Sequence, residues 1–291
     1  MKFVLTLALL LTTSIASAKT VHPKTTAELR EVTVRIMNLE MTSGGTGSIF
    51  KSFDNATHIL TNKHICRLIE PGGVVLDNKG EKHLVTHYKK FPDHDLCLIR
   101  VDGNMGIDLE VSGTLAKATA KSVVSGHPHL LPHIATVGHL TDQQDIQLMV
   151  GVRECTKEEM KTDPLLCMFV GGMPVLETLT AQVSSNMIQP GNSGSAVFNK
   201  DGEIIGVVFA GEGGDFSYAF LVPQINILYF IQTAHLLEFV AVGTPVDDKG
   251  VQDRVFNYDI AKCRDVKGKT ESKYDSIKRY CKSADTLIWR K

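Results

Sequence analysis

The segment IQPGNSGSAVFNKDGEIIGVVF, residues 188–209, places a serine between glycines and then continues directly into apolar sequence. Ser193 follows Gly191-Asn192 and precedes Gly194, and two short apolar runs separated by a polar turn come next. Glycine allows a left-handed backbone and the close approach of a neighbouring group. A hydroxyl on such a turn is either an exposed nucleophile or an ordinary hairpin serine, and the rest of the sequence has to decide between the two.

The composition is that of a folded soluble protein. The chain has 291 residues, of which 43% are hydrophobic and 22% are charged, and the formal net charge is −1. This length leaves room for one large core or two small ones. The balanced charge argues against nucleic acid as the main partner.

The N-terminus has the pattern of an export signal. A short basic start, Met1-Lys2, precedes an apolar run over 3–11, and Ala16-Ser17-Ala18 fits a small-x-small cleavage site. The pattern predicts a signal peptide over 1–18, cleavage after Ala18 and a periplasmic or secreted protein. A membrane anchor is the alternative interpretation, but the run is too short to span about 30 Å of hydrocarbon. We therefore expect no stable membrane span after signal removal.

Six cysteines in an exported chain make disulfide bonds plausible. Two pairs are close in sequence, Cys155 with Cys167 and Cys263 with Cys281, and we expect each to be bridged locally. Cys66 and Cys97 lie in apolar runs, as buried thiols or as a third bridge. Six cysteines allow 15 connectivities, so the sequence alone does not choose among them.

Short Val-, Ile- and Thr-rich runs alternate with turn residues from residue 32 to residue 223. This spacing is typical of an antiparallel sandwich or barrel. The expected strands are 33–37, 45–50, 58–61, 96–101, 135–140, 177–183, 196–198, 204–209 and 218–222. After Pro223, apolar residues recur at helical spacing, which predicts a helix over 224–240 packed on the strands.

A serine hydroxyl becomes a good nucleophile only when a base takes its proton, and a carboxylate has to orient that base. In HILTNKHIC, residues 58–66, an apolar strand ends and His64 follows at once. In DHDLCLIRV, residues 93–101, Asp95 opens an apolar strand and is placed to fix the tautomer of an imidazole. Asp93 is the alternative orienting residue, but it lies in a polar loop. A purely structural role for His64 also stays open.

HILTNKHI, HDLCLIRV and IQPGNSGSAVFNKDGEIIGV together resemble the three signature segments of the chymotrypsin-like serine proteases. They are most similar to the bacterial periplasmic high-temperature-requirement branch, and SGHP at 125–128 with TVG at 136–138 resembles that branch as well. The resemblance extends from about residue 44 to residue 223. It implies an all-β fold of two packed antiparallel six-stranded barrels with the active site between them.

The resemblance implies a serine endopeptidase that cuts a protein or peptide substrate through an acyl-enzyme intermediate, without a cofactor or a metal. Ser193 would attack the carbonyl, His64 would carry the proton and Asp95 would orient His64. The backbone N–H groups of Gly191 and Ser193 would form the oxyanion hole. A catalytically silent binding or regulatory protein on the same fold is the alternative function.

The same resemblance predicts how the chain is divided. A protease domain would cover 19–240, with barrel one at about 30–115 and barrel two at about 120–222. Residues 241–291 form a tail that is too short for the peptide-binding domain common in the periplasmic branch. From residue 262 onward the tail has ten Lys and Arg against four Asp and Glu, so it is either a solvated appendage or a contact for an acidic surface.

Two positions in the turn modify this expectation. Digestive relatives have an aspartate before the nucleophile that pairs with a new N-terminus after zymogen cleavage. Asn192 cannot form that ion pair, so signal removal should be the only processing required. Ser195 stands where relatives usually have glycine, which puts the fine geometry of the turn in question.

The S1 pocket of such a protease receives P1, the substrate residue before the scissile bond. By resemblance, the walls of this pocket would contain no acidic residue and no histidine. We therefore expect a small or medium apolar P1 residue. Glu212 lies nearby and leaves a basic contribution open. The predicted walls are Met187, Phe209, Ala210, Gly211 and Ala219.

Two other enzyme classes fit less well. An α/β-hydrolase needs Gly-x-Ser-x-Gly and its partners in the order Ser, Asp, His, but Ser195 replaces the second glycine and strands do not alternate with helices. A zinc enzyme would draw on clustered histidines, although no His-Glu-x-x-His occurs. The two histidine clusters are His83, His87 and His94, and His127, His129 and His133.

Overall fold

The structure is a computed structural model that describes residues 18–53, 55–92, 94–162, 173–212, 218–234 and 237–243. The signal peptide predicted over 1–18 lies outside these ranges except for Ala18, and the predicted tail does so from residue 244 onward. Within the described ranges, no helix is long and apolar enough to cross a membrane.

The first barrel is a ring of six antiparallel strands in which β6 also pairs with β7 and closes the sheet. Its inner face is buried and strongly β-branched, with Val34, Ile36, Ile59 and Ile99 at the centre of one apolar cluster. The strands are β2 (Thr33–Asn38), β3 (Gly44–Phe53), β4 (Ala56–Thr61), β5 (Gly73–Leu76), β6 (Lys82–Lys90) and β7 (Cys97–Asp102).

The second barrel is closed and consists of six antiparallel strands in the order β10-β11-β14-β13-β12-β9. The predicted fold class, two packed six-stranded barrels, is therefore confirmed. The strands are β9 (Lys121–Gly126), β10 (Ile134–Arg153), β11 (Met173–Ser184), β12 (Ala196–Phe198), β13 (Ile204–Glu212) and β14 (Tyr218–Pro223).

One apolar cluster joins the two barrels. It contains Leu60 and Leu96 from the first barrel together with Ala196 and Val207 from the second, all nearly inaccessible to solvent. Because protein interiors are close-packed, this contact fixes the barrels relative to each other. Functional side chains on the two barrels are thereby held in one arrangement.

Smaller elements cover the ends of the barrels. A short parallel pair joins β1 (Lys19–Val21) to β8 (Ile107–Leu109). Helix α1 (Thr26–Val32) begins with a capping box in which Thr25 and Glu28 bond to each other's backbone N–H groups. The remaining short elements are α2 (Lys63–Leu68), the 3₁₀ turn η1 (Pro128–Leu130) and α3 (Glu159–Thr162).

The helix predicted over 224–240 is too long. Helix α5 covers Gln224–Thr233, and residues 240–241 form a two-residue strand, β15 (Val240–Ala241). Val240 pairs with Tyr88 and Ala241 with His87 on β6 of the first barrel. The segment therefore satisfies its backbone groups by strand pairing with a distant part of the chain, which helical periodicity cannot reveal.

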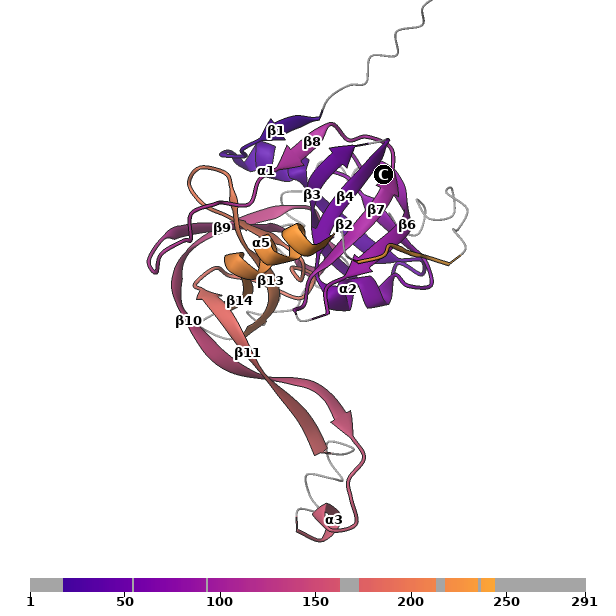
Figure 1. Ribbon diagram of the computed structural model, residues 1–291, viewed down its shortest axis with the longest axis vertical. Helices are drawn as coiled ribbons and strands as arrows, with labels where there is room; N and C mark the ends of the chain where they lie inside the picture. The colour runs from indigo at the N-terminus through magenta and orange to yellow at the C-terminus, as the bar shows by residue number, and fades with distance from the viewer. Residues whose placement is uncertain are drawn as a thin grey trace, which may run out of the picture.

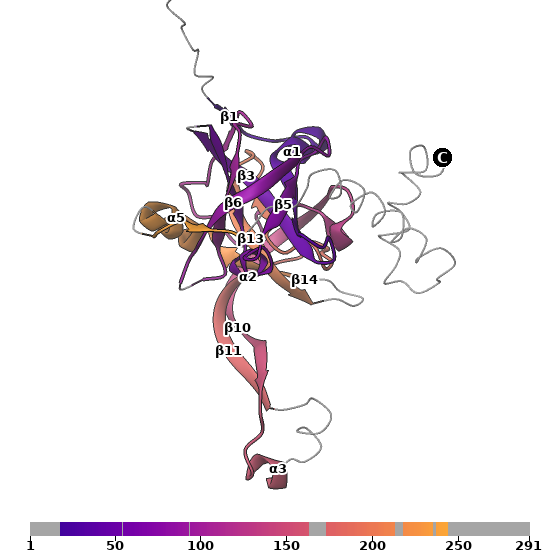
Figure 2. The same cartoon turned by 90° about the vertical axis from the view of Figure 1, so that its right-hand side faces the viewer.

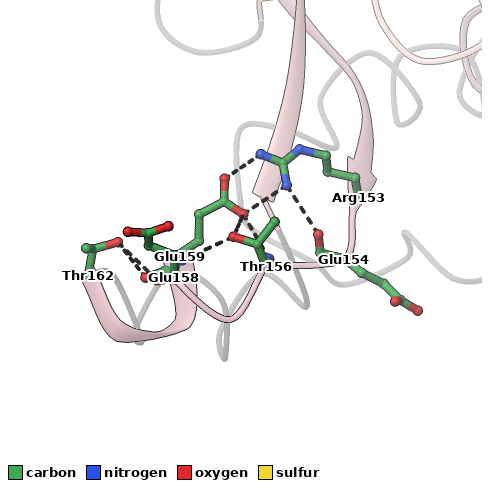
Figure 3. Close-up of polar contacts among 6 residues, drawn as sticks. All are labelled: Arg153, Glu154, Thr156, Glu158, Glu159 and Thr162. Carbon is green, nitrogen blue, oxygen red and sulfur yellow. Dashed lines mark hydrogen bonds and ion pairs between the residues drawn. The ribbon is translucent and has the colours of Figure 1, made fainter.

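Strands β10 and β11 continue beyond the second barrel as a two-stranded arm with α3 near its tip (Figures 1 and 2). Figure 3 shows the polar contacts at that tip, where both guanidinium ends of Arg153 donate to the Glu159 carboxylate at 2.9 and 2.5 Å. This contact lowers the pKa of Glu159 well below its ordinary value. Thr156 accepts a bond from Glu159 N and caps the turn.

The described cysteines are all oxidised. Cys66 and Cys97 form a disulfide, which was one of the two states that the sequence left open for them. Cys155, near the tip of the arm, is also disulfide-bonded, and its partner lies outside the described residues. Cys167, Cys263 and Cys281 fall outside them too, so both pairings expected from the sequence stay predictions.

Candidate active site

His64 and Asp95 are joined by two hydrogen bonds. The imidazole Nδ1 lies 2.6 Å from Asp95 Oδ2, and the backbone N–H of His64 donates to Asp95 Oδ1 at 2.9 Å. Asn62 adds a third tie by donating from Nδ2 to the Asp95 carbonyl at 2.8 Å. The imidazole side chain is 38% exposed and the carboxylate 20%. The carboxylate therefore holds one nitrogen of the ring while the other edge stays open to a reactant.

The first barrel brings these two residues together. Strand β4 ends just before His64, and β7 begins just after Asp95, and the two strands pair with Thr61 opposite Cys97. The disulfide between Cys66 and Cys97 connects the residue two positions after His64 to the residue two positions after Asp95. The disulfide and the pairing of β4 with β7 therefore both hold His64 close to Asp95.

Replacing Cys66 and Cys97 together by alanine is expected to lower the free energy of unfolding by about 3–4 kcal/mol, because the bridge closes a loop of 31 residues in the unfolded chain. Activity should fall as well, since α2 would be free to carry His64 away from Asp95. Urea unfolding and peptide hydrolysis would measure both effects. Cys155→Ala is the control for losing a disulfide elsewhere, and an unfolding free energy equal to that of the wild type would contradict the prediction.

The turn that carries Ser193 is attached to the first barrel. Thr46 on β3 donates its backbone N–H to the Ser193 carbonyl at 2.8 Å and its hydroxyl to the Gly191 carbonyl at 2.8 Å. A Cβ on Gly45 would lie 2.7 Å from Ser193 O and 2.6 Å from Ile65 Cδ1, so the serine turn and helix α2 meet at this glycine. The turn that carries Ser193 on the second barrel therefore lies next to the helix that carries His64 on the first.

Two backbone N–H groups of this turn have no hydrogen-bond partner among the described residues. The N–H groups of Asn192, Gly194 and Ser195 donate to the carbonyls of Gln189, Val208 and Asn192 respectively. Those of Gly191 and Ser193 donate to nothing in the part of the chain that the structure describes. Both residues are only partly buried, so these two donors on one tight turn are available to an acceptor that binds there.

Glycine is required at two positions of the turn. Gly191 has φ +97° and Gly194 has φ +87°, both in the left-handed region. A Cβ on Gly191 would lie 2.5 Å from the carbonyl oxygen of His127, and one on Gly194 would lie 2.1 Å from that of Thr46. Any side chain would displace the turn and its two free N–H groups.

The segment around η1 supports the same turn. His127 donates its backbone N–H to the Thr46 hydroxyl at 2.9 Å, and His129 donates its own to the Pro190 carbonyl. The His127 ring is buried, with Nδ1 2.9 Å from the carbonyl of Leu131. Burial, reinforced by the charge of Arg35, holds the pKa of His127 well below its usual range, so the ring is neutral near pH 7.

Acid should loosen this segment through His133. Burial, with a smaller contribution from Arg30, lowers the pKa of His133 to about 4, whereas the unfolded chain has a histidine pKa of about 6.5. Between pH 6.5 and pH 4, His133 is protonated in the unfolded chain and neutral in the folded chain. The free energy of unfolding should therefore fall as the pH drops from about 6.5 to 4, by up to about 3 kcal/mol.

Urea unfolding across this pH range, compared between wild type and His133→Gln, would measure the effect. Glutamine cannot take the proton, and it keeps a polar atom for the Ser125 hydroxyl, which lies 2.7 Å from His133 Nε2. The variant should show a shallower pH dependence. If the free energy of unfolding depends on pH equally in the two proteins, His133 is not the residue responsible.

The residues predicted to bind the substrate side chain do not form one group. Met187 points to one side of the segment 187–189, and the predicted residues of β13 and β14 lie on the other side. Met187 is exposed and lines a hollow together with residues of β9 and β10. Phe209, Ala210 and Gly211 lie on β13, where Gly211 pairs with Ala219 of β14. Ile188, which the sequence analysis did not select, packs on this second group. A Cβ on Gly211 would lie 2.2 Å from Ile188 Cδ1.

One group of side chains within the described ranges has the spacing of metal ligands. Asp77, Glu81 and His83 have ligand atoms that all lie within 4.8 Å of one another, next to the turn between β5 and β6. Neither histidine cluster considered as a zinc site forms such a group among the described residues. His127 and His133 stand with their ring centres 6.2 Å apart, and each ring bonds to a neighbouring protein oxygen instead.

Residues 45–207 match the family model for a trypsin-like peptidase domain. Among solved structures, the chain is similar to the active form of the Rv3671c protease from M. tuberculosis, with a TM-score of 0.54 and 17% identity over 79% of this chain and 92% of that one. It is also similar to a serine endoprotease from Yersinia pestis, with a TM-score of 0.52 and 17% identity over 72% and 66%.

A third similar structure is the HtrA-type protease AlgW with a tripeptide, with a TM-score of 0.52 and 16% identity over 72% of this chain and 63% of that one. No curated protein sequence gives a significant match. At these identities the solved structures establish the fold, whereas the family model covers more than half of the chain.

Proposed function

The chain belongs to the trypsin-like peptidase family and is a serine-type endopeptidase, and we propose that His64, Asp95 and Ser193 are its catalytic residues. Ser193 Oγ attacks the substrate carbonyl while His64 Nε2 takes the hydroxyl proton. His64 then returns that proton to the leaving amine, which leaves an acyl-enzyme. A water molecule deprotonated by His64 releases the acyl group and restores the serine.

In this proposal, Asp95 orients the His64 ring and selects its tautomer. Its Oδ2 accepts the Nδ1 proton, so the unprotonated nitrogen faces outward, and the negative charge stabilises the imidazolium that forms in each step. Its Oδ1 is held by the His64 backbone. Each carboxylate oxygen therefore has one fixed partner, and the ring cannot rotate without losing a bond.

The observation that carries the proposal is the pair of unpaired N–H groups on Gly191 and Ser193. The tetrahedral intermediate of acyl transfer places a negative oxygen beside the nucleophile, and preorganised donors at that position stabilise it. Removal of one such donor costs about 3 kcal/mol of barrier in comparable sites. A serine that only closed a hairpin would have no need for this arrangement.

Reaction with a fluorophosphonate probe, followed by peptide mapping, tests the assignment. The expected result is one phosphonylated residue, Ser193, because the probe needs an activated serine and an oxyanion site. A zinc chelator should leave the labelling unchanged. If a folded protein takes up no probe, the catalytic assignment fails, and a binding role on the same fold replaces it.

We also propose that the protein acts in the periplasm or outside the cell. The predicted signal peptide supports this location, and so do the oxidised cysteines, because disulfides persist in oxidising compartments. The substrate is a protein or peptide. N-terminal sequencing of the exported protein should begin at Lys19 if cleavage occurs after Ala18.

For the substrate pocket, we propose that Ile188 limits the P1 residue to small aliphatic side chains. Ile188 is 8% exposed, lies against Gly211 and shares an apolar cluster with Ala219. Its side chain therefore takes up space that a P1 residue would fill. Met187, another predicted wall, lies on the other side of the segment, where it lines a hollow with residues of β9 and β10.

Replacing Ile188 by alanine should enlarge this pocket. The ratio of kcat/KM for a Phe substrate over an Ala substrate is expected to rise by roughly 10–100-fold, because each methylene in a pocket is worth about 1–3 kcal/mol. Peptides that differ only at P1 would measure it. Ile205→Ala, a similar loss from the same apolar cluster, is the control and should leave the ratio unchanged. If both variants shift it equally, Ile188 has no specific role.

A further inference from the structure

A hollow of about 330 Å³ lies between the two barrels, next to Asp95, and is distinct from the one that Met187 lines. The first barrel contributes His94 and Asp95, just before β7, and strands β11, β13 and β14 of the second barrel contribute the rest. Neither His64 nor Ser193 is among the described residues that line it. Ligand clefts are typically about 300–1,000 Å³, so this hollow is large enough for a small molecule.

Two carboxylates make the surroundings of this hollow negative. Asp95 lines it, and the Asp95 side chain is 20% exposed although His64 bonds to both of its oxygens. A carboxylate has about four acceptor positions, and His64 uses two of them. The second carboxylate belongs to Asp145 on β10, whose Oδ1 accepts a bond at 2.8 Å from the hydroxyl of Thr180, a residue on another wall.

No positive charge balances these carboxylates from the walls. No lysine or arginine is among the described residues that line the hollow. His94 is the one described lining residue that could become a cation, and its Nδ1 lies 3.4 Å from Nδ2 of Asn226 on α5. An amide NH₂ group only donates hydrogen bonds, so this bond requires the neutral imidazole ring. The hollow therefore has room for a cation that the protein itself does not supply.

The remaining walls decide which kind of cation fits. Four of them are apolar, and the face of an aromatic ring such as that of Phe209 attracts cations. A metal ion would need several oxygen ligands and would leave the apolar walls without a contact. A neutral apolar ligand would gain nothing from Asp95. The apolar walls are Leu179, Phe209, Val222 and Pro223.

We propose that this hollow, named here the Asp95 hollow, binds a small organic amine as its ammonium cation. The ammonium group donates to the remaining acceptor positions of Asp95 and to the hydroxyl oxygens of Thr178 and Thr180, which also line the hollow. The hydrocarbon part of the amine packs on Leu179 and Phe209. Apart from Phe209, none of the predicted substrate-pocket residues lines the Asp95 hollow, so it is a second binding site.

A bound ammonium group slows catalysis through the carboxylate that it contacts. The negative charge of Asp95 stabilises the His64 imidazolium that forms in each step, and an ammonium group on the same carboxylate offsets that charge. The value of kcat therefore falls. The KM stays the same, because the amine lies on a side of Asp95 that His64 does not line. This second step rests on the proposed function, whereas the binding itself does not.

Binding is tested with 2-phenylethylamine and 2-phenylethanol as probes, followed by methyl NMR of the full protein at about pH 8. The amine is charged there, because the alkylammonium group of lysine titrates at about 10.4, whereas the alcohol has a similar shape and no charge. The amine should bind saturably and shift the methyl signals of Leu179 and Val222. The signals of Ile188, beside the substrate pocket, and of Ile59, in the first barrel, should stay unchanged. The alcohol should bind at least tenfold more weakly.

Asp95→Asn removes the charge at nearly constant shape, so this variant should bind the amine and the alcohol equally. Asp201→Asn removes an exposed carboxylate from the turn between β12 and β13 and should keep the preference for the amine. Thr178→Lys adds an ammonium group at the hollow and should weaken amine binding at least tenfold, which keeps the test valid if Asp95→Asn does not fold. Thr162→Lys, the same change on the exposed arm, is its control. Absence of saturable shifts in the wild type, or an unchanged preference in Asp95→Asn with unchanged affinity in Thr178→Lys, overturns the proposal.

The effect on catalysis is measured by steady-state peptide hydrolysis. Saturating 2-phenylethylamine should lower kcat at least threefold and leave KM unchanged, and 2-phenylethanol at the same concentration should change neither. A raised KM with unchanged kcat would place the amine in the substrate pocket and overturn the coupling. Binding without any change of rate overturns the coupling and leaves the site. Methyl shifts in a protein that hydrolyses no peptide and whose Ser193 takes up no fluorophosphonate would refute the proposed function alone.

Discussion

Ser193→Ala is expected to lower kcat for peptide hydrolysis by about 10⁵–10⁶-fold, since removal of the nucleophile of a triad costs about as much as removal of the whole triad. The remaining rate would come from the oxyanion donors and substrate binding. Fluorophosphonate labelling should vanish at the same time. Neither loss should be accompanied by unfolding, because the Ser193 side chain makes no hydrogen bond on which the described fold depends.

The matched control is Ser185→Ala, a similar change at an exposed serine of the same barrel, which should retain wild-type kcat. Far-ultraviolet circular dichroism and thermal unfolding would establish that both variants are folded. Substantial hydrolysis by Ser193→Ala, above any contaminating protease, would show that another residue is the nucleophile.

Asp95→Asn is expected to lower kcat by about 10⁴-fold, and the hydrogen bonds explain why. The His64 backbone N–H must donate to one side-chain atom of residue 95, and His64 Nδ1 faces the other. Asparagine has one acceptor and one donor, so its oxygen keeps the backbone bond and its NH₂ faces Nδ1. The imidazole then has to accept at Nδ1 and carries its proton on the nitrogen that should receive the serine proton.

The variant therefore keeps its fold and has the wrong tautomer. Steady-state hydrolysis would give kcat, and nitrogen chemical shifts of the His64 ring would report the tautomer directly. Asp93→Asn is the matched control, because the sequence left Asp93 as the alternative orienting residue. Asp93 itself lies outside the described residues. Loss of activity in Asp93→Asn, with Asp95→Asn active, would exchange the two roles.

Most of the fold could be predicted because its signals are local. Strands such as 58–61 and 204–209 are short apolar runs between turn residues, and each lies within an observed strand. The residues His64 and Asp95 could be placed because each stands at the end of such a run. What joined them in the prediction was the order of three motifs, and the structure supplies the hydrogen bonds between them.

The features that sequence reasoning missed depend on contacts between distant segments. Thr46 was expected only as part of the strand 45–50, yet its backbone and hydroxyl bond to the serine turn. The sequence left a bridge between Cys66 and Cys97 open, and the pairing of β4 with β7 explains why it forms. The arm formed by β10 and β11 was expected as two short strands, because its outer half faces solvent and has no buried periodicity.

The substrate pocket was the least predictable part. Met187, Ile188 and Gln189 follow one another, and extended backbone points alternate residues to opposite sides. A shift of one residue would therefore exchange Ile188, which contacts Gly211, with Met187, which lies on the other side of the segment. Composition could not determine this alternation, whereas the contact of Ile188 with Gly211 does.

The position of His64 and Asp95 at the meeting of β4 and β7 also has a consequence during biosynthesis. Between these two residues the chain makes β5 and β6, and such long-range strand pairing forms slowly. His64 and Asp95 therefore meet only when β7 pairs with β4. A nascent or half-folded molecule in which this pairing has not formed lacks the proposed triad, so we expect proteolytic activity to appear only after the first barrel has folded.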